Sequence, residues 1–219
     1  MLRQREEPGK SSSPRESEPA SGGLSDEDCF VLARSGDHPS QAEMVARYMP
    51  RIFNLFSRCL GDRELAADGT QEVFLRVFRE ADRFDARRSF KGWIFAIAWN
   101  LARDHLRRKA ARRKAELRGR SCRSGSGGGE DDGEPVDSRE ASPLDLLERK
   151  EEQDAVRHAL ARLDPRQRAL LVLREFEDLS YEELSELFGC PVGTIKSGIH
   201  RARLDLKNVL LALQPWRYS

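Results

Sequence analysis

Residues 180–203 read SYEELSELFGCPVGTIKSGIHRAR, and this stretch decides the fold of the C-terminal part of the chain. Ser180 followed by Glu183 forms a capping box, which predicts the start of a short helix. Gly189 and Pro191 then break the helical pattern, and a second helix follows. Two short helices joined by a tight turn predict a helix-turn-helix.

The second of these helices has two different faces. At about 100° per residue, its apolar residues fall within roughly one third of the circle: Ile195, Ile199, Ala202, Leu206 and Val209. Basic and hydroxyl side chains occupy the opposite side: Lys196, Ser197, His200 and Arg201. Such a face suits base edges and phosphates in the major groove of DNA. A solvated face on an ordinary helical hairpin would give the same pattern.

Helix signals recur along the rest of the chain. Asp62, Ser89 and Asp164 stand at N-cap positions, and Pro165 follows at a first helical position. Apolar residues recur every three or four positions, which predicts helices and not strands. With 219 residues, of which 38% are hydrophobic, the chain has material for two small cores. The predicted fold class is all-α, with two small helical domains joined by a flexible linker.

Composition sets the boundaries of these domains. Residues 1–24 are rich in Ser, Pro, Glu and Gly and are predicted to be disordered. Residues 25–116 form the first helical domain, residues 117–143 an acidic Gly/Ser linker, and residues 144–213 the second domain. The chain shows neither a signal peptide nor an apolar run of about 20 residues. We therefore expect a cytoplasmic protein with no membrane insertion.

The formal net charge of +1 conceals two opposed blocks. Residues 87–123 contain thirteen Lys or Arg and two acidic residues, a net charge of +11. Residues 130–154 contain eleven acidic and three basic residues, a net charge of −8. A basic block predicts a polyanionic partner. The basic block continues from the aromatic run SFKGWIFAIAWNLA, and basic side chains beside aromatic rings suit single-stranded DNA as a partner. Core packing also explains these aromatic residues, and it is the interpretation we favour for Trp93.

Nothing in the sequence predicts a metal site, a cofactor or an enzyme. The four cysteines are widely spaced, with no CxxC pair, and are expected to be reduced thiols: Cys29, Cys59, Cys122 and Cys190. The acidic and imidazole groups nearest the basic block are scattered among arginines: Asp82, Asp85, Asp104 and His105. A hydrolase needs such groups clustered around a metal or a water molecule, so ion pairs are expected instead.

Three stretches together resemble bacterial RNA polymerase sigma factors of the sigma-70 family, in the extracytoplasmic-function (ECF) group. They are GDRELAADGTQEVFLRVFREADRFD, SFKGWIFAIAWNLARDHLRR and ALARLDPRQRALLVLREFEDLSYEELSELFGCPVGTIKSGIHRAR. The resemblance covers about residues 25–115 and 145–212. It implies region 2 and region 4 domains without a region 3 domain between them. The implied function is binding core RNA polymerase and directing promoter-specific initiation, with no enzymatic activity.

The resemblance also implies three functional surfaces. Region 4 would read the −35 duplex through Thr194, Lys196, Ser197, His200, Arg201 and Arg203. Region 2 would capture the melted −10 element through Phe84, Arg87, Arg88, Lys91, Asn100, Arg107 and Arg108. Region 2 would dock on the clamp helices of the largest polymerase subunit through Asp68, Gln71, Glu72 and Phe74. Further implied partners are the flap of the second-largest subunit, promoter DNA and an anti-sigma factor.

Two glycines depart from the family pattern. Gly69 stands where a bulky aliphatic residue is usual, and Gly198 stands where arginine is usual. Because arginine at 198 would add a phosphate contact, we expect Gly198→Arg to tighten binding to promoter duplex. The main alternative function is a stand-alone helix-turn-helix transcriptional regulator. Such a protein would dimerise on two half-sites and bind duplex DNA without polymerase.

Overall fold

The computed structural model describes residues 24–119 and 143–213, with side chains for 24–116 and 152–213. Every regular element in these ranges is a helix, which confirms the predicted all-α class. The predicted disordered extension (1–24) and flexible linker (117–143) lie, apart from their edges, outside the described residues, as does Cys122. Within the described ranges, no helix combines the length and apolarity that a membrane span requires.

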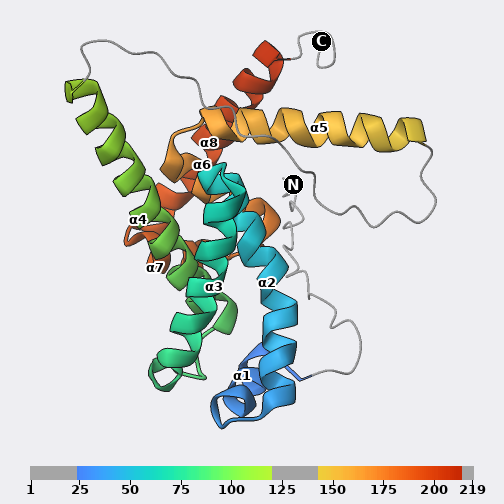
Figure 1. The fold of residues 1–219 in the computed structure, drawn as a ribbon, viewed down its shortest axis with the longest axis vertical. Helices are drawn as coiled ribbons and strands as arrows, with labels where there is room; N and C mark the ends of the chain where they lie inside the picture. The colour runs from blue at the N-terminus through green and yellow to red at the C-terminus, as the bar shows by residue number, and fades with distance from the viewer. Residues whose placement is uncertain (1–23, 120–142, 214–219) are drawn as a thin grey trace, which may run out of the picture.

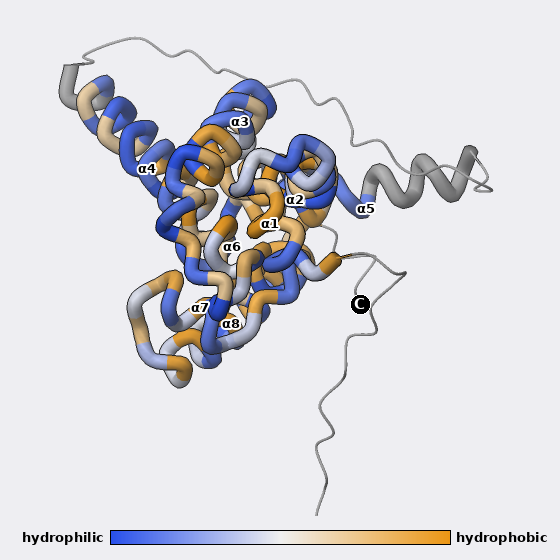
Figure 2. Tube along the Cα trace, turned by 90° about the horizontal axis from the view of Figure 1, so that it is seen from below, coloured by the Kyte–Doolittle hydropathy of each residue, from blue (hydrophilic) through white to orange (hydrophobic). Residues whose placement is uncertain are grey.

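The first domain is a bundle of four helices with one short 3₁₀ turn (Figure 1). Its elements are α1 (Asp26–Arg34), α2 (His38–Leu60), α3 (Arg63–Arg79), η1 (Ala81–Arg83) and α4 (Phe90–Gly119). Both predicted N-caps are present, since Asp62 accepts from the Leu65 amide and Ser89 from the Gly92 amide. The C-terminal half of α4 projects from the bundle (Figure 1). Residues 107–116 of this half are exposed, and Figure 2 shows hydrophilic residues recurring along it.

The second domain contains the predicted helix-turn-helix. Its elements are α5 (Pro143–Arg162), α6 (Pro165–Leu171), the π-helical turn η2 (Val172–Phe176), α7 (Tyr181–Phe188) and α8 (Val192–Leu213). Asp164 caps α6, and the capping box of Ser180 and Glu183 starts α7, as predicted. Gly189 ends α7 with φ 62°, a left-handed conformation that glycine adopts without strain.

Gly69 brings α3 close to α2. A Cβ atom at this position would lie 2.8 Å from Cε1 of Phe56, well inside van der Waals contact. The Phe56 ring is fully buried in a core where side chains are close-packed, so a shift of the ring would disturb its neighbours. The ring therefore fills the volume that a bulky aliphatic side chain at position 69 would need, which explains this departure from the family pattern.

The two domains pack against each other. Helix α2 contacts α5, α6 and η2, and α4 contacts α7. Buried apolar residues of both domains join in one continuous core. Sequence analysis predicted two separate bodies on a tether, and it missed this packing because the contacts join residues far apart in the chain.

Candidate nucleic-acid interface

Helix α8 presents the predicted −35 face to solvent. Ile195, Ile199 and Ala202 are buried beneath the helix and hold it against the domain. All six residues predicted to read the −35 duplex are exposed: Thr194, Lys196, Ser197, His200, Arg201 and Arg203. The geometry thus separates a buried apolar face from an exposed polar face, as the helical wheel predicted.

Contacts within the domain orient several of these side chains. The Lys196 ammonium lies 5.3 Å from the ring centroid of Tyr181, and the Arg201 Nε lies 3.4 Å from the Ser197 carbonyl. Arg203 differs from its neighbours because it forms an ion pair with Glu175, at 2.6 Å. A phosphate contact by Arg203 would have to compete with this carboxylate, whereas among the described residues the Arg201 guanidinium faces a weak backbone acceptor and no acidic group.

Gly198 lies beside a core residue of α6. A Cβ atom at this position would lie 3.1 Å from Cδ1 of Leu170, which is buried. Any side chain at position 198 therefore needs the end of Leu170 to move by a few tenths of an ångström. Tighter duplex binding by Gly198→Arg stays a prediction. The close approach of the added Cβ to Leu170 would lower the stability of the domain, and the sequence did not reveal this contact.

The structure places Phe84, predicted to capture a −10 base, in the core of the first domain. Its ring packs edge-on against Phe30 at 5.3 Å and lies 5.2 Å from Trp93. Only 5% of Phe84 is exposed, and Trp93 lies half-buried against the same core. Base capture by Phe84 stays a prediction, and it would require the ring to leave this aromatic cluster.

The polar residues predicted to contact the −10 element lie along α4 and in the loop before it. Asn100, Arg107 and Arg108 are exposed along the helix. Arg87 donates to Asp85 at 3.0 Å, and this hydrogen bond lowers the pKa of Asp85 to about 2. The two remaining residues of the set, Arg88 and Lys91, contact the second domain.

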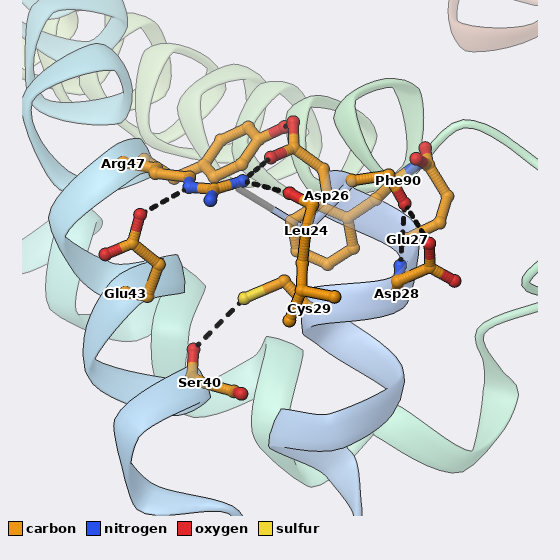
Figure 3. Close-up of polar contacts among 11 residues, drawn as sticks. Leu24, Asp26, Glu27, Asp28, Cys29, Ser40, Glu43, Arg47 and Phe90 are labelled. Carbon is orange, nitrogen blue, oxygen red and sulfur yellow. Dashed lines mark hydrogen bonds and ion pairs between the residues drawn. The ribbon is translucent and has the colours of Figure 1, made fainter. Parts of the chain in front are cut away.

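Helix α1 fixes the N-terminus of α4, a role that the sequence did not reveal. The Glu27 carboxylate accepts a hydrogen bond from the Phe90 amide at 2.8 Å (Figure 3). Asp26 holds α1 on α2 by accepting from Tyr48 at 2.5 Å and from Arg47 at 2.8 Å. No local pattern predicts these contacts, because Glu27 and Phe90 lie 63 positions apart.

The predicted polymerase-docking residues lie on α3 in different environments. Asp68 and Gln71 are exposed, and Glu72 pairs with Arg76 at 2.7 Å. Phe74 is only 8% exposed and belongs to the core. Its neighbour Leu75 is 58% exposed and provides the apolar surface on this part of α3. Sequence analysis did not single out Leu75, although this apolar residue lies out of phase with the buried stripe of Val73, Phe74 and Val77 and could have been predicted to be exposed.

Comparison with known proteins identifies both domains. The Sigma-70 region 2 family profile matches residues 44–112, and the Sigma-70, region 4 profile matches residues 153–206. The ECF RNA polymerase sigma factor SigW of Bacillus subtilis is 31% identical over 179 residues, covering 81% of this chain and 92% of that protein. The ECF RNA polymerase sigma factor SigE of Mycolicibacterium smegmatis is 33% identical over 183 residues, covering 82% of this chain. This chain spans 66% of the length of the latter relative.

A solved structure shares the fold. The sigma factor RpoE in complex with the anti-sigma factor NepR from Bartonella quintana aligns with a TM-score of 0.58 and 23% identity, covering 77% of this chain and 95% of that one. Region 2 precedes region 4 on this chain, and the relatives are ECF sigma factors. The chain therefore belongs to the sigma-70 family of non-enzymatic transcription initiation factors, in the ECF group.

Proposed function

We propose that this protein binds core RNA polymerase and directs it to promoters, with region 4 reading the −35 duplex and region 2 capturing the melted −10 strand. The observation that supports this proposal most strongly is the exposed polar face of α8 on a helix whose other face is buried. A helix-turn-helix presents its second helix to the major groove in this way.

For the −35 element, we propose that Arg201 and Lys196 are the main contacts. Both are exposed cations on the outer face of α8, and neither forms an ion pair with an acidic group of its own domain in the described residues. Arginine and lysine donate to guanine edges and to phosphates. Ser197, His200 and Thr194 lie on the same face and add shorter polar contacts.

For the −10 element, we propose that the exposed polar side chains of α4 follow the phosphates of a single strand. Arg107 and Arg108 are exposed at the start of the C-terminal half of the helix, which projects from the bundle. Asn100 lies two helical turns before them and is exposed. Basic side chains along a helix supply affinity that depends on salt and little on sequence.

The protein partners follow from the same surfaces. The exposed residues of α3, namely Asp68, Gln71 and Leu75, form the surface that we propose docks on the clamp helices of the largest polymerase subunit. We also propose that region 4 contacts the flap of the second-largest subunit, and that an anti-sigma factor regulates the protein in the bacterial cytoplasm. The Bartonella quintana relative in complex with its anti-sigma factor supports the last proposal.

Arg201→Ala is expected to weaken binding of the reconstituted polymerase holoenzyme to promoter duplex by about 10- to 100-fold, because one base or phosphate contact is lost. The measurement is a filter-binding titration on a fragment selected from genomic DNA by the wild-type holoenzyme. Lys207→Ala is the matched control, since this exposed cation lies on α8 less than two turns further along. Unchanged affinity of Arg201→Ala, or equal losses in both variants, would contradict the assignment.

A further inference from the structure

A cavity of about 360 Å³ lies where α4 of the first domain meets α6 and α7 of the second. Helices α4 and α7 are in contact here (Figure 1). Cavities of this size are typical of sites for small molecules and are too small for a folded partner. The DNA and polymerase surfaces proposed above share only Arg107 with its lining, so most of this site has no part in the proposed function.

The inner lining of the cavity is apolar. Trp99 is 4% exposed, and Leu106 and Phe188 are half-buried. The rings of Trp99 and Phe188 lie against each other across the two domains, with centroids 5.4 Å apart. Trp99, Leu106 and Ala110 share one face of α4, because helical periodicity brings residues seven and four positions apart to the same side. This wall can bury the apolar body of a ligand.

Three arginines lie at the exposed side of the same cavity, Arg103 and Arg107 on α4 and Arg166 on α6. Among the described residues, Arg103 and Arg107 form no ion pair with a carboxylate. The Arg166 guanidinium has neutral neighbours, since it lies 5.6 Å from the Phe188 ring centroid and donates to Cys190 Sγ at 3.5 Å. All three guanidinium groups therefore retain N–H donors for an anion.

Asp164 is the acidic residue among the described residues of the lining. Its carboxylate already caps α6, because it accepts a hydrogen bond from the Arg166 amide at 3.0 Å. Three cations thus face one engaged carboxylate, and the cavity attracts anions and repels cations. The apolar wall distinguishes this place from the rest of the basic surface of α4, which offers cations without a cavity beside them.

We propose that this cavity binds a small amphipathic anion. The body of the ligand, an alkyl chain or a planar ring, packs against Trp99, Leu106 and Phe188. Its carboxylate, sulfonate or phosphate group accepts from Arg103 and Arg166, because guanidinium groups bind such oxyanions through paired hydrogen bonds. Since the lining comes from both domains, the bound ligand stabilises their packing by mass action. Binding requires neither DNA nor polymerase and is therefore independent of the proposed function.

Titration of the full chain with anilinonaphthalene sulfonate, whose fluorescence rises in apolar surroundings, tests this site. The probe has a planar apolar body and one sulfonate, and its neutral counterpart phenylnaphthylamine lacks the sulfonate. Arg103→Ala is expected to weaken binding of the anionic probe by about tenfold and binding of the neutral probe by less than about twofold. Arg112→Ala is the matched control, because this exposed cation of α4 lies outside the cavity.

Ala110→Trp tests the cavity separately from its charge. Ala110 is exposed and lines the cavity, so a larger ring at this position fills the space without changing a buried residue or an arginine. Binding of both probes should weaken by about fivefold or more, because the ring and the probe compete for one volume. Equal losses of the anionic probe with Arg103→Ala and Arg112→Ala, or unchanged binding with Ala110→Trp, would overturn the proposal.

Competition distinguishes the two kinds of apolar body. Displacement of the bound anionic probe by decanoate and not by naphthoate would assign an alkyl chain, and the reverse would assign a planar ring. Displacement by both would show that the cavity accepts either body. Each of these results supports an amphipathic anion as the ligand. Failure of both carboxylates to displace the probe at millimolar concentration would overturn the proposal.

Discussion

Arg51→Ala is expected to shift the equilibrium between packed and separated arrangements of the two domains by about 3 kcal/mol toward separation, roughly a hundredfold. Arg51 is the hydrogen-bonded partner of the Glu177 carboxylate, which is 3% exposed. Burial raises the pKa of Glu177 even though Arg51 opposes the effect. Without Arg51, the packed arrangement must bury a carboxylate that has lost the hydrogen bond from this arginine.

Glu177→Gln should have a much smaller effect, below about tenfold. This change removes the buried charge itself, and Arg51, whose side chain is 35% exposed, can then be hydrated. The double variant should resemble Glu177→Gln alone. The asymmetry follows from the burial of one partner and the exposure of the other, and not from the loss of the ion pair, which both single changes share.

A full chain carrying Gly92→Cys and Glu183→Cys provides the measurement, because a Cβ atom at position 92 would lie 3.5 Å from Cγ of Glu183 when the domains are packed. Its disulfide equilibrium against glutathione reports the effective concentration of the two thiols, and so the population of the packed arrangement. That constant should fall with Arg51→Ala by up to about a hundredfold, and by more than with Glu177→Gln. An unchanged constant with Arg51→Ala, or equal decreases with Arg51→Ala and Glu177→Gln, would contradict this account of the buried pair.

Gly69→Ala is expected to lower the free energy of unfolding by about 1–3 kcal/mol, although alanine favours helix over glycine by about 1 kcal/mol. The added Cβ would lie 2.8 Å from Cε1 of the fully buried Phe56 ring. Either the ring or the whole of α3 must shift, and both lie in a close-packed core. Leucine at position 69 should destabilise further, because its larger side chain competes with the same ring.

Urea unfolding followed by circular dichroism measures this effect. Gly193→Ala is the control, because that glycine is exposed and no atom lies within 4 Å of an added Cβ. The control should be neutral or slightly stabilised. Adding Phe56→Leu to Gly69→Ala should recover part of the loss, since a smaller side chain at 56 makes room. A midpoint for Gly69→Ala at or above that of the unchanged protein would contradict the explanation.

Local sequence signals predicted the helices and their ends. Asp62, Asp164 and the Ser180 capping box act within three residues, so their effect can be read from neighbouring positions. The two faces of α8 were predictable for the same reason, because periodicity fixes which residues share a side of a helix. The fold class and the exposed polar face of α8 therefore follow from the sequence.

Contacts between distant segments were not predictable in this way. The basic residues at 88 and 91 gave no sign that the acceptors would be Glu186 and Asp178. Phe84 is an aromatic residue that could stack on a base, but it is buried in a cluster of five aromatic rings centred on Phe30. In each case the outcome depends on which surfaces meet in the folded chain, and a single sequence contains no direct record of that.

Run-off transcription on a pool of genomic fragments, with purified bacterial core RNA polymerase in the presence and absence of this protein, tests the central claim most directly. The account predicts specific transcripts only when the protein is present, with a shared pair of motifs at −35 and −10 upstream of their starts. No protein-dependent transcript, combined with tight dimeric binding to duplex DNA without polymerase, would contradict the account and favour a stand-alone regulator.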